Sequence, residues 1–128
     1  MFTPDQIKAA YSKVKTGADY PNYAKEIFSL GVRNYTTCVA DGNTVYCGNN
    51  GFRIESGPQY ASLQVATKHD GATFREKLKQ HQSGLSDFPT FCKEAAGTGV
   101  DNWVVDLEKM TCTYYSKDGT LLVVEQIK

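Results

Sequence analysis

The sequence predicts an α+β protein in which helices cover one face of a mainly antiparallel sheet. Two observations predict this class. Segments with helical apolar spacing precede runs of β-branched and aromatic residues, and this order of elements occurs twice. We expect one domain of 128 residues made of two tandem ααβββ repeats, 1–56 and 71–128, which are joined by a linker at 57–70 and related by a pseudo-two-fold axis.

The repeat is visible as a direct match within the chain. A shift of 68 positions aligns residues 19–51 with 87–119 without a gap, and nine of the 33 aligned positions are identical. Ordinary composition would produce roughly two identities. Aromatic character is also kept at the pair Tyr35 and Trp103 and at the identical pair Tyr46 and Tyr114. We interpret the match as an internal duplication.

Each repeat is expected to start with two helices. Ile7, Ala10, Tyr11 and Val14 have the spacing of an amphipathic helix, and 72–82 is its counterpart. Glycines suited to a left-handed helix end follow both segments, and the next two helices open at aspartates with a proline in the first turn and close at glycines. These residues are Gly17 and Gly84, Asp19 and Asp87, Pro21 and Pro89, and Gly31 and Gly99.

Three strands are expected after each helix pair. They are placed at about 33–40, 43–49, 52–56, 102–108, 111–117 and 120–127. The dipeptides Asp41-Gly42, Asn50-Gly51 and Asp118-Gly119 are typical of two-residue type I′ turns. The second repeat has Lys109-Met110 in place of Asp41-Gly42, so we expect that turn to differ or to be longer. The linker segment 62–66 is a candidate seventh strand.

The alternation of side chains along the strands predicts two different sheet faces. A two-residue turn at Asp41-Gly42 would pair Thr37 with Tyr46. The face expected beneath the helices holds Tyr35, Thr37, Val39, Thr44, Tyr46, Trp103, Val105, Leu107, Cys112 and Tyr114. The other face holds Thr36, Cys38, Val45, Cys47, Ile54, Val104, Asp106, Thr113, Tyr115, Leu122 and Val124.

This second face is too apolar for a freely solvated sheet surface. Three explanations remain open: the repeats pack sheet against sheet, a homodimer covers the face, or the face lines a ligand pocket.

Charge and composition exclude several classes of protein. The formal net charge is zero, so no overall field attracts nucleic acid or anionic membrane, and no apolar run reaches the ~20 residues of a membrane span. The first ten residues lack a secretory pattern, so we expect a cytoplasmic location. Basic residues on the first and third helices are expected to be solvated rather than to contact nucleic acid. They are Lys8, Lys13, Lys15, Lys68, Arg75, Lys77 and Lys79.

The candidate chemical groups have simple structural interpretations. Cys38, Cys47, Cys92 and Cys112 contain no CxxC pair and are expected to be free thiols, with no metal or cofactor. His69 precedes Asp70, which is expected to cap a helix, and His81 is placed where a positive charge suits a helix C-terminus. Asp106, Glu108 and Glu125 are not expected to form a catalytic carboxylate pair, because Asp106 and Glu125 fall on opposite faces.

The chain resembles a family of small enterobacterial and prophage-encoded proteins. The resemblance rests on MFTPDQIKAA, on the SG/TG-xx-aromatic-P segments, on VADG and on WVVDLEKMTCTYY, and it covers nearly the whole chain. The family is the YbcV/YdfO-like domain of unknown function, which is sometimes labelled a phage envelope protein. It implies no catalytic residues.

The sequence does not identify a reaction or a ligand. It favours a non-catalytic binding or protein-interaction module that forms a homodimer through Val104, Tyr115, Leu122 and Val124. The alternative is a ligand-binding protein or enzyme with a pocket between the repeats, lined by Tyr46, Trp103 and Tyr114. A third hypothesis is a prophage regulator that binds nucleic acid.

Overall fold

The computed structural model describes residues 2–15 and 19–127. Two helices and three strands follow one another, and the same order then recurs. The first set comprises α1 (Pro4–Tyr11), α2 (Tyr20–Leu30), β1 (Asn34–Cys38), β2 (Thr44–Cys47) and β3 (Arg53–Glu55). The second set comprises α3 (Gly71–Gln82), α4 (Phe88–Gly97), β4 (Val100–Asp106), β5 (Thr111–Ser116) and β6 (Leu121–Gln126). The α+β class predicted from the sequence is confirmed.

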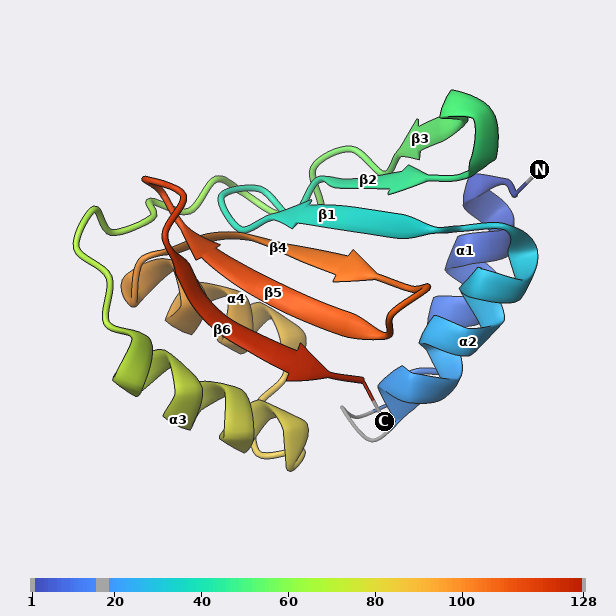
Figure 1. The fold of residues 1–128 in the computed structure, drawn as a ribbon. Helices are drawn as coiled ribbons and strands as arrows, with labels where there is room; N and C mark the ends of the chain where they lie inside the picture. Colours follow the sequence, from blue (N-terminus) through green and yellow to red (C-terminus); the bar gives the residue numbers. More distant parts are fainter. Residues whose placement is uncertain (1, 16–18, 128) are drawn as a thin grey trace.

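The six strands form a single antiparallel sheet in the order β3-β2-β1-β4-β5-β6 (Figure 1). The two halves meet at the centre, where β1 pairs with β4 and Thr36 lies opposite Val104. One explanation of the apolar second face is therefore wrong, because the halves share one sheet and do not pack sheet against sheet. The common origin of the halves stays a prediction.

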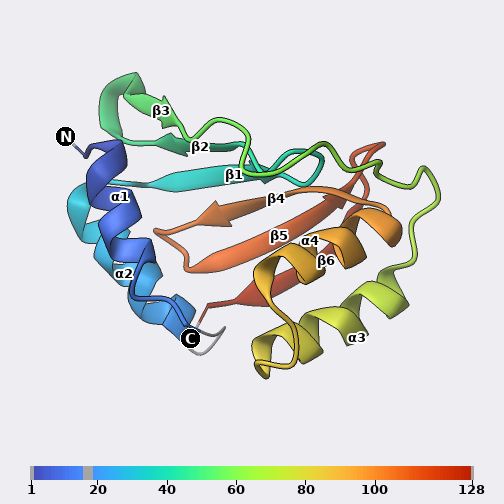
Figure 2. The same cartoon turned by 180° about the vertical axis from the view of Figure 1, so that it is seen from behind.

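Helices α3 and α4 lie over one side of the sheet, the side that faces the viewer in Figure 2, whereas α1 and α2 lie across one end of the strands. The core lies between these layers. The ring of Phe74 from α3 lies 4.9 Å from that of Tyr114, and the ring of Phe91 from α4 lies 5.9 Å from that of Trp103. In the other half, Tyr23 from α2 is buried, and its hydroxyl lies near that of Tyr46. The opposite face of the sheet carries no helix from the described ranges (Figure 1).

The helix ends follow local chemistry. Asp70 accepts a hydrogen bond from the Thr73 amide at 3.1 Å, so its predicted capping role is confirmed. Gly84 follows α3 with a φ of 80°, as predicted, and Gly31 follows α2 with a φ of 113°. Asp87 caps α4 through the Thr90 amide at 2.8 Å.

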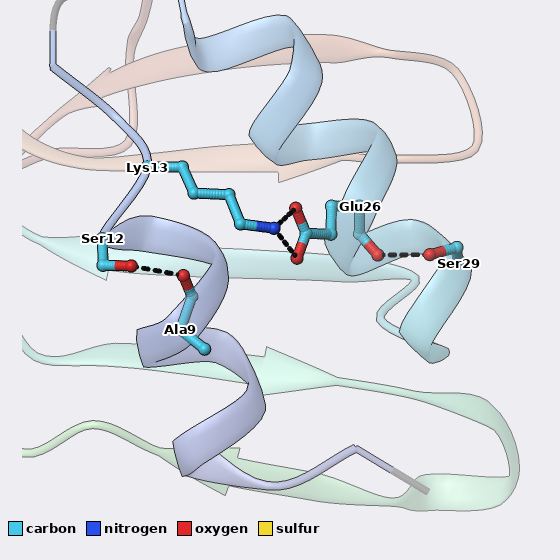
Figure 3. Close-up of polar contacts among 5 residues, drawn as sticks. All are labelled: Ala9, Ser12, Lys13, Glu26 and Ser29. Carbon is cyan, nitrogen blue, oxygen red and sulfur yellow. Dashed lines mark hydrogen bonds and ion pairs between the residues drawn. The ribbon is translucent and has the colours of Figure 1, made fainter.

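The first helix is shorter than predicted. It ends at Tyr11, and Val14 lies beyond it. The Ser12 hydroxyl donates to the Ala9 carbonyl at 2.6 Å, which gives that helix-end carbonyl a partner outside the backbone ladder (Figure 3). Gly17 lies outside the described residues.

The β1–β2 turn is also longer than predicted. Thr37 pairs with Thr44, not with Tyr46, and residues 39–42 form a four-residue connection. The register between β1 and β2 differs from the predicted one by two residues, so the side chains of these two strands keep their predicted faces. The β4–β5 turn was expected to differ from the β1–β2 turn, but the two turns have the same register. Trp103 pairs with Tyr114 at the equivalent register, and Met110 takes a φ of 54° where Gly42 takes 76°.

The linker is ordered but contains no seventh strand at 62–66. Its amides donate instead to two different elements, Leu63 to the Ala40 carbonyl at 2.6 Å and Ala66 to the Ala96 carbonyl at 2.9 Å. Val65 is buried between them. The segment therefore connects the β1–β2 turn to α4 without joining the sheet.

Candidate interaction surface

The face of the sheet opposite the helices carries a row of small β-branched side chains. We call this face the open face and the row the Val/Thr stripe. Strand pairing places the stripe residues directly beside one another from β2 to β6, in the order Val45, Thr36, Val104, Thr113 and Val124. Side chains of this type make a flat apolar surface, which is suited to packing against another flat surface.

Charged side chains border the stripe, and Glu55 lies directly opposite its first residue, Val45. Arg53 and Glu55 form an ion pair of 3.5 Å on the edge strand β3. The Asp106 carboxylate accepts hydrogen bonds from the amides of Glu108 and Lys109 at 3.0 and 3.1 Å, so it holds the following turn. The stripe itself contains no ionisable side chain.

Three of the four predicted interface residues lie on the open face. Val104 and Tyr115 are partly exposed, and Val124 is 53% exposed. The prediction for Leu122 is wrong, because that side chain is buried. A bulge shifts the pairing between β5 and β6, so Leu121 lies opposite Tyr115 and is 53% exposed. Sequence alternation could not find Leu121, because one extra residue reverses the faces beyond it.

Ile54 is also on the face opposite to the predicted one. It pairs with Tyr46 and packs against the core beneath the helices. Strand β3 has only three residues and follows a short 3₁₀ turn at Asn49–Gly51. In so short a strand, the face on which each side chain lies depends on the residue at which the preceding turn ends, and the sequence does not fix that residue.

The three residues proposed to line a pocket lie on the helix side. Trp103 and Tyr114 are 7% and 6% exposed, and their rings are 5.9 Å apart. Tyr46 is partly exposed and its ring lies 5.4 Å from that of Tyr35. Burial raises the pKa of Tyr114 well above its ordinary value, so its hydroxyl stays neutral. The structure brings Trp103 and Tyr114 together as packed core.

Two surface hollows are lined by other residues. A hollow of 210 Å³ lies among Phe2, Leu30, Gly31, Gly48, Asn49, Asn50 and Phe52. Another of 170 Å³ lies between α1 and α2, next to the ion pair of 3.0 Å between Lys13 and Glu26 that Figure 3 shows. Neither hollow contains Tyr46, Trp103 or Tyr114.

Asp70 and His81 lie at the two ends of α3 and have separate contacts there. Asp70 is the cap of α3, and hydrogen bonds from Thr73 lower its pKa. His81 stacks on Phe91 with ring centroids 4.4 Å apart, and its Nδ1 lies 3.1 Å from the Ser86 carbonyl. Burial lowers the pKa of His81, which opposes the positive charge expected at this helix end.

The acidic and basic candidates are also separated. Asp106 pairs with Thr111 on the open face, whereas Glu125 lies on the other face and accepts from Tyr114 at 3.4 Å. Among the basic residues, Lys77 forms an ion pair of 3.2 Å with Glu94, in addition to the pair made by Lys13.

The four cysteines are free thiols, as predicted. Cys92 and Cys112 are buried, and burial raises the pKa of Cys112 to about 12. Cys38 and Cys47 are partly exposed and belong to the open face, at strand positions that alternate with buried side chains. This contrast supplies two reactive reporters on the open face and two protected ones in the core.

The described part of the chain contains neither a cluster of metal ligands nor a membrane-spanning helix. In residues 2–15 and 19–127, no three His, Cys, Asp or Glu side chains gather as metal ligands would. Within the same ranges, every helix is too short or too polar to cross a bilayer.

Comparison with known proteins identifies relatives without an assigned activity. The chain is 36% identical over 66 residues to the uncharacterized protein YcgX of Escherichia coli, a match that covers 52% of this chain and 49% of that protein. It is 29% identical over 97 residues to the uncharacterized protein Rv2012 of Mycobacterium tuberculosis, covering 75% of this chain and 59% of that protein. The chain thus spans about half the length of the first relative. A family profile described as "Protein of unknown function (DUF1398)" matches residues 8–126. Because this match includes nearly the whole chain, the protein belongs to that family of unknown function.

Proposed function

We propose that the protein is a non-catalytic, cytoplasmic protein-interaction module of bacterial or prophage origin, and that the open face is its docking surface. The observation that carries the proposal is the uncovered Val/Thr stripe. Helices α3 and α4 cover one face of the sheet, while the other face presents valine and threonine side chains across five strands. A contiguous apolar patch on a folded protein is typical of an interaction site.

The arrangement of polar groups supports an interaction role over catalysis. The carboxylates with clear partners hold turns or helix ends: Asp70 and Asp87 cap helices and Asp106 holds a turn. His81 packs on an aromatic ring, and its Nδ1 lies 3.1 Å from the Ser86 carbonyl and 3.3 Å from the Ser86 hydroxyl. Each of these groups has a structural role at a helix end or a turn, and the charge of Asp87 also acts on His81.

Thiol labelling tests whether the open face is covered in the cell. Cys38 and Cys47 should react more slowly in intact host cells than in dilute purified protein, because a docked partner shields them. A cysteine introduced by Thr67→Cys at the exposed linker serves as the reference for reagent concentration. Cys92 and Cys112 should remain unlabelled in both settings until the protein unfolds.

A pair of matched variants completes the test. Thr113→Lys places a charge on the stripe and should restore fast labelling of Cys38 and Cys47 in cells. Thr67→Lys makes the same chemical change away from the face and should leave the protection intact. Equal labelling in cells and in buffer for the unmodified protein would refute the proposal.

A further inference from the structure

We infer that the hollow of 210 Å³ at the end of α2 binds a small aromatic carboxylate, whose ring lies against Phe2 and Phe52 and whose carboxylate pairs with Arg33. This site goes beyond the proposed docking function, because it is lined by residues other than those of the Val/Thr stripe. Three segments meet there at one end of the sheet: the N-terminal residues, the end of α2 and the turn between β2 and β3 (Figure 1 and Figure 2).

The apolar wall of the hollow is suited to a flat ring. The rings of Phe2 and Phe52 lie 4.7 Å apart in an edge-to-face arrangement. Gly48 lies against both, since a Cβ atom there would be 3.4 Å from each ring and 3.2 Å from the Gly31 carbonyl oxygen. The two glycines therefore leave room that side chains would fill. An apolar cavity of about 150 Å³ holds a benzene molecule, so this hollow accommodates a ring with one substituent.

The guanidinium of Arg33 is held at the rim of the hollow. Its Nε donates to the side-chain carbonyl of Asn49 at 3.2 Å, and Asn49 lines the hollow. Its Cζ lies 4.6 Å from the centroid of the Phe28 ring, which holds the group from a second side. Among the described residues, no carboxylate forms an ion pair with Arg33. A guanidinium fixed in this way offers its terminal nitrogens to a carboxylate in a two-point contact.

The charge around the hollow selects an anionic ligand. The residues that line it are uncharged, and Arg33 is bonded to one of them. The carbonyls of the last turn of α2 already have donors, because the Gly31 amide donates to Phe28 at 3.0 Å and the Val32 amide donates to Ile27 at 3.1 Å. Arg33 would repel a cationic ligand, and a neutral ligand would leave its charge unpaired. A carboxylate supplies the opposite charge.

The same corner of the second half is built differently. The residues 68 positions further on change the charged group, the small residue and the aromatic residue of the site. The pairs are Arg33 and Asp101, Gly48 and Ser116, and Phe52 and Thr120. A Cβ on Gly99 would lie 2.6 Å from the Cα of His69, so the linker occupies the space that is open beside Gly31. The first half thus combines an aromatic hollow with a guanidinium, whereas the second has an acidic side chain and linker backbone there.

Titration of the isotope-labelled full chain with sodium benzoate, followed by NMR of the backbone amides, tests the inference. Benzoate should shift the amides of Gly31, Gly48 and Asn49 until they saturate, with a dissociation constant of roughly 0.1–5 mM for so small a ligand. Benzamide has the same ring without the charge, and acetate has the charge without the ring. Each should bind about tenfold more weakly than benzoate.

Two arginine variants separate the guanidinium from the rest of the protein. Arg33→Gln should weaken benzoate binding about tenfold and leave benzamide binding unchanged. Arg75→Gln makes the same change on α3 in the other half and should alter neither. The amide spectrum of each variant shows whether it is folded, and the comparison of benzoate with benzamide on the unmodified protein does not depend on either variant.

Three results would overturn the inference. The first is the absence of saturable shifts at these amides with benzoate up to about 50 mM. The second is equal affinity of the unmodified protein for benzoate and benzamide. The third is a folded Arg33→Gln variant that binds benzoate as tightly as the unmodified protein does.

Discussion

Tyr35 with Tyr46 in the N-terminal half and Trp103 with Tyr114 in the C-terminal half occupy equivalent places in the sheet. Each pair lies directly opposite across a hairpin, with residues 68 apart in corresponding positions. Tyr35 and Trp103 are both buried, at 5% and 7% exposure. The C-terminal pair is more heavily packed, because Trp103 also contacts the rings of Phe88 and Phe91.

The linker makes the two halves unequal. Linker residues lie against Gly42 in the first half and against Gly99 in the second, whereas a Cβ atom on Gly31, the counterpart of Gly99, would have no atom within 4 Å. A Cβ atom at Gly42 would lie 2.7 Å from the Tyr60 ring, whereas Met110 carries a full side chain in a similar backbone conformation. Two similar halves therefore come under different sequence constraints once a connecting segment packs on only part of each.

The largest effect is expected from the aromatic pairs. Trp103→Ala should destabilise the protein by about 4 kcal/mol, because it leaves a cavity among three rings. Tyr35→Ala should cost less, since a single ring pairs with it. Urea unfolding of both variants measures the difference, and a greater loss for Tyr35→Ala would show that the halves are packed in the opposite order.

Gly31 and Gly99, the glycines at the helix–strand junctions of the two halves, differ in how closely other atoms approach them. A Cβ at Gly99 would lie 2.6 Å from the His69 Cα, whereas Gly31 has no atom within 4 Å of that position. Both have positive φ angles, so Gly31→Ala should cost about 1 kcal/mol from backbone strain. Gly99→Ala should cost about 2–3 kcal/mol, because the linker backbone must also move. Equal unfolding free energies for the two variants would mean that the linker does not constrain this junction.

A smaller, pH-dependent effect is expected at His81 in the second half. Burial against Phe91 lowers its pKa from the ordinary value of 6.5, while Asp87 and Glu94 oppose the shift. Because the folded pKa lies below the unfolded one, the stabilisation is present above about pH 6.5 and is lost as the pH falls through the folded pKa. Unfolding between about pH 5 and 8 should show this loss, and His81→Gln should reduce it. NMR titration of the imidazole gives the folded pKa directly; a value above 6.5 would contradict the assignment.

The smallest effect is expected at the β5–β6 turn. Hydrogen bonds from Ser116 and Thr120 lower the pKa of Asp118 from 3.8 to about 2. The carboxylate thus contributes stability above about pH 4 that is lost as the pH falls through about 2. Asn50 occupies the aligned position of the first half and does not titrate. Hydrogen exchange at the Thr120 amide should accelerate in this acid range, and Asp118→Asn should remove the pH dependence without affecting the β2–β3 turn.

Local patterns predicted most of the elements. The capping role of Asp70, the helix end at Gly84 and the positions of the six strands follow from interactions within a few residues of sequence. The four-residue turn after β1 and the bulge beside Tyr115 were not predicted, because they are set by how neighbouring strands fit together.

The sequence predicted which face of the sheet carries the candidate site, but it did not predict every residue on that face. Val104, Tyr115 and Val124 were assigned to the open face by alternation, and they lie there. Leu122 and Ile54 were assigned wrongly, because each follows an irregularity in an edge strand. Whether the face docks a partner stays a prediction.

The sequence by itself determined which residues form helices and strands and which side chains share a face, because these depend on backbone periods of about 3.6 and 2 residues. Only the tertiary structure decided that β1 and β4 join the halves into one sheet, and that the linker packs against both. Such contacts join residues far apart in the chain, so they depend on how whole elements fit together and not on any local pattern.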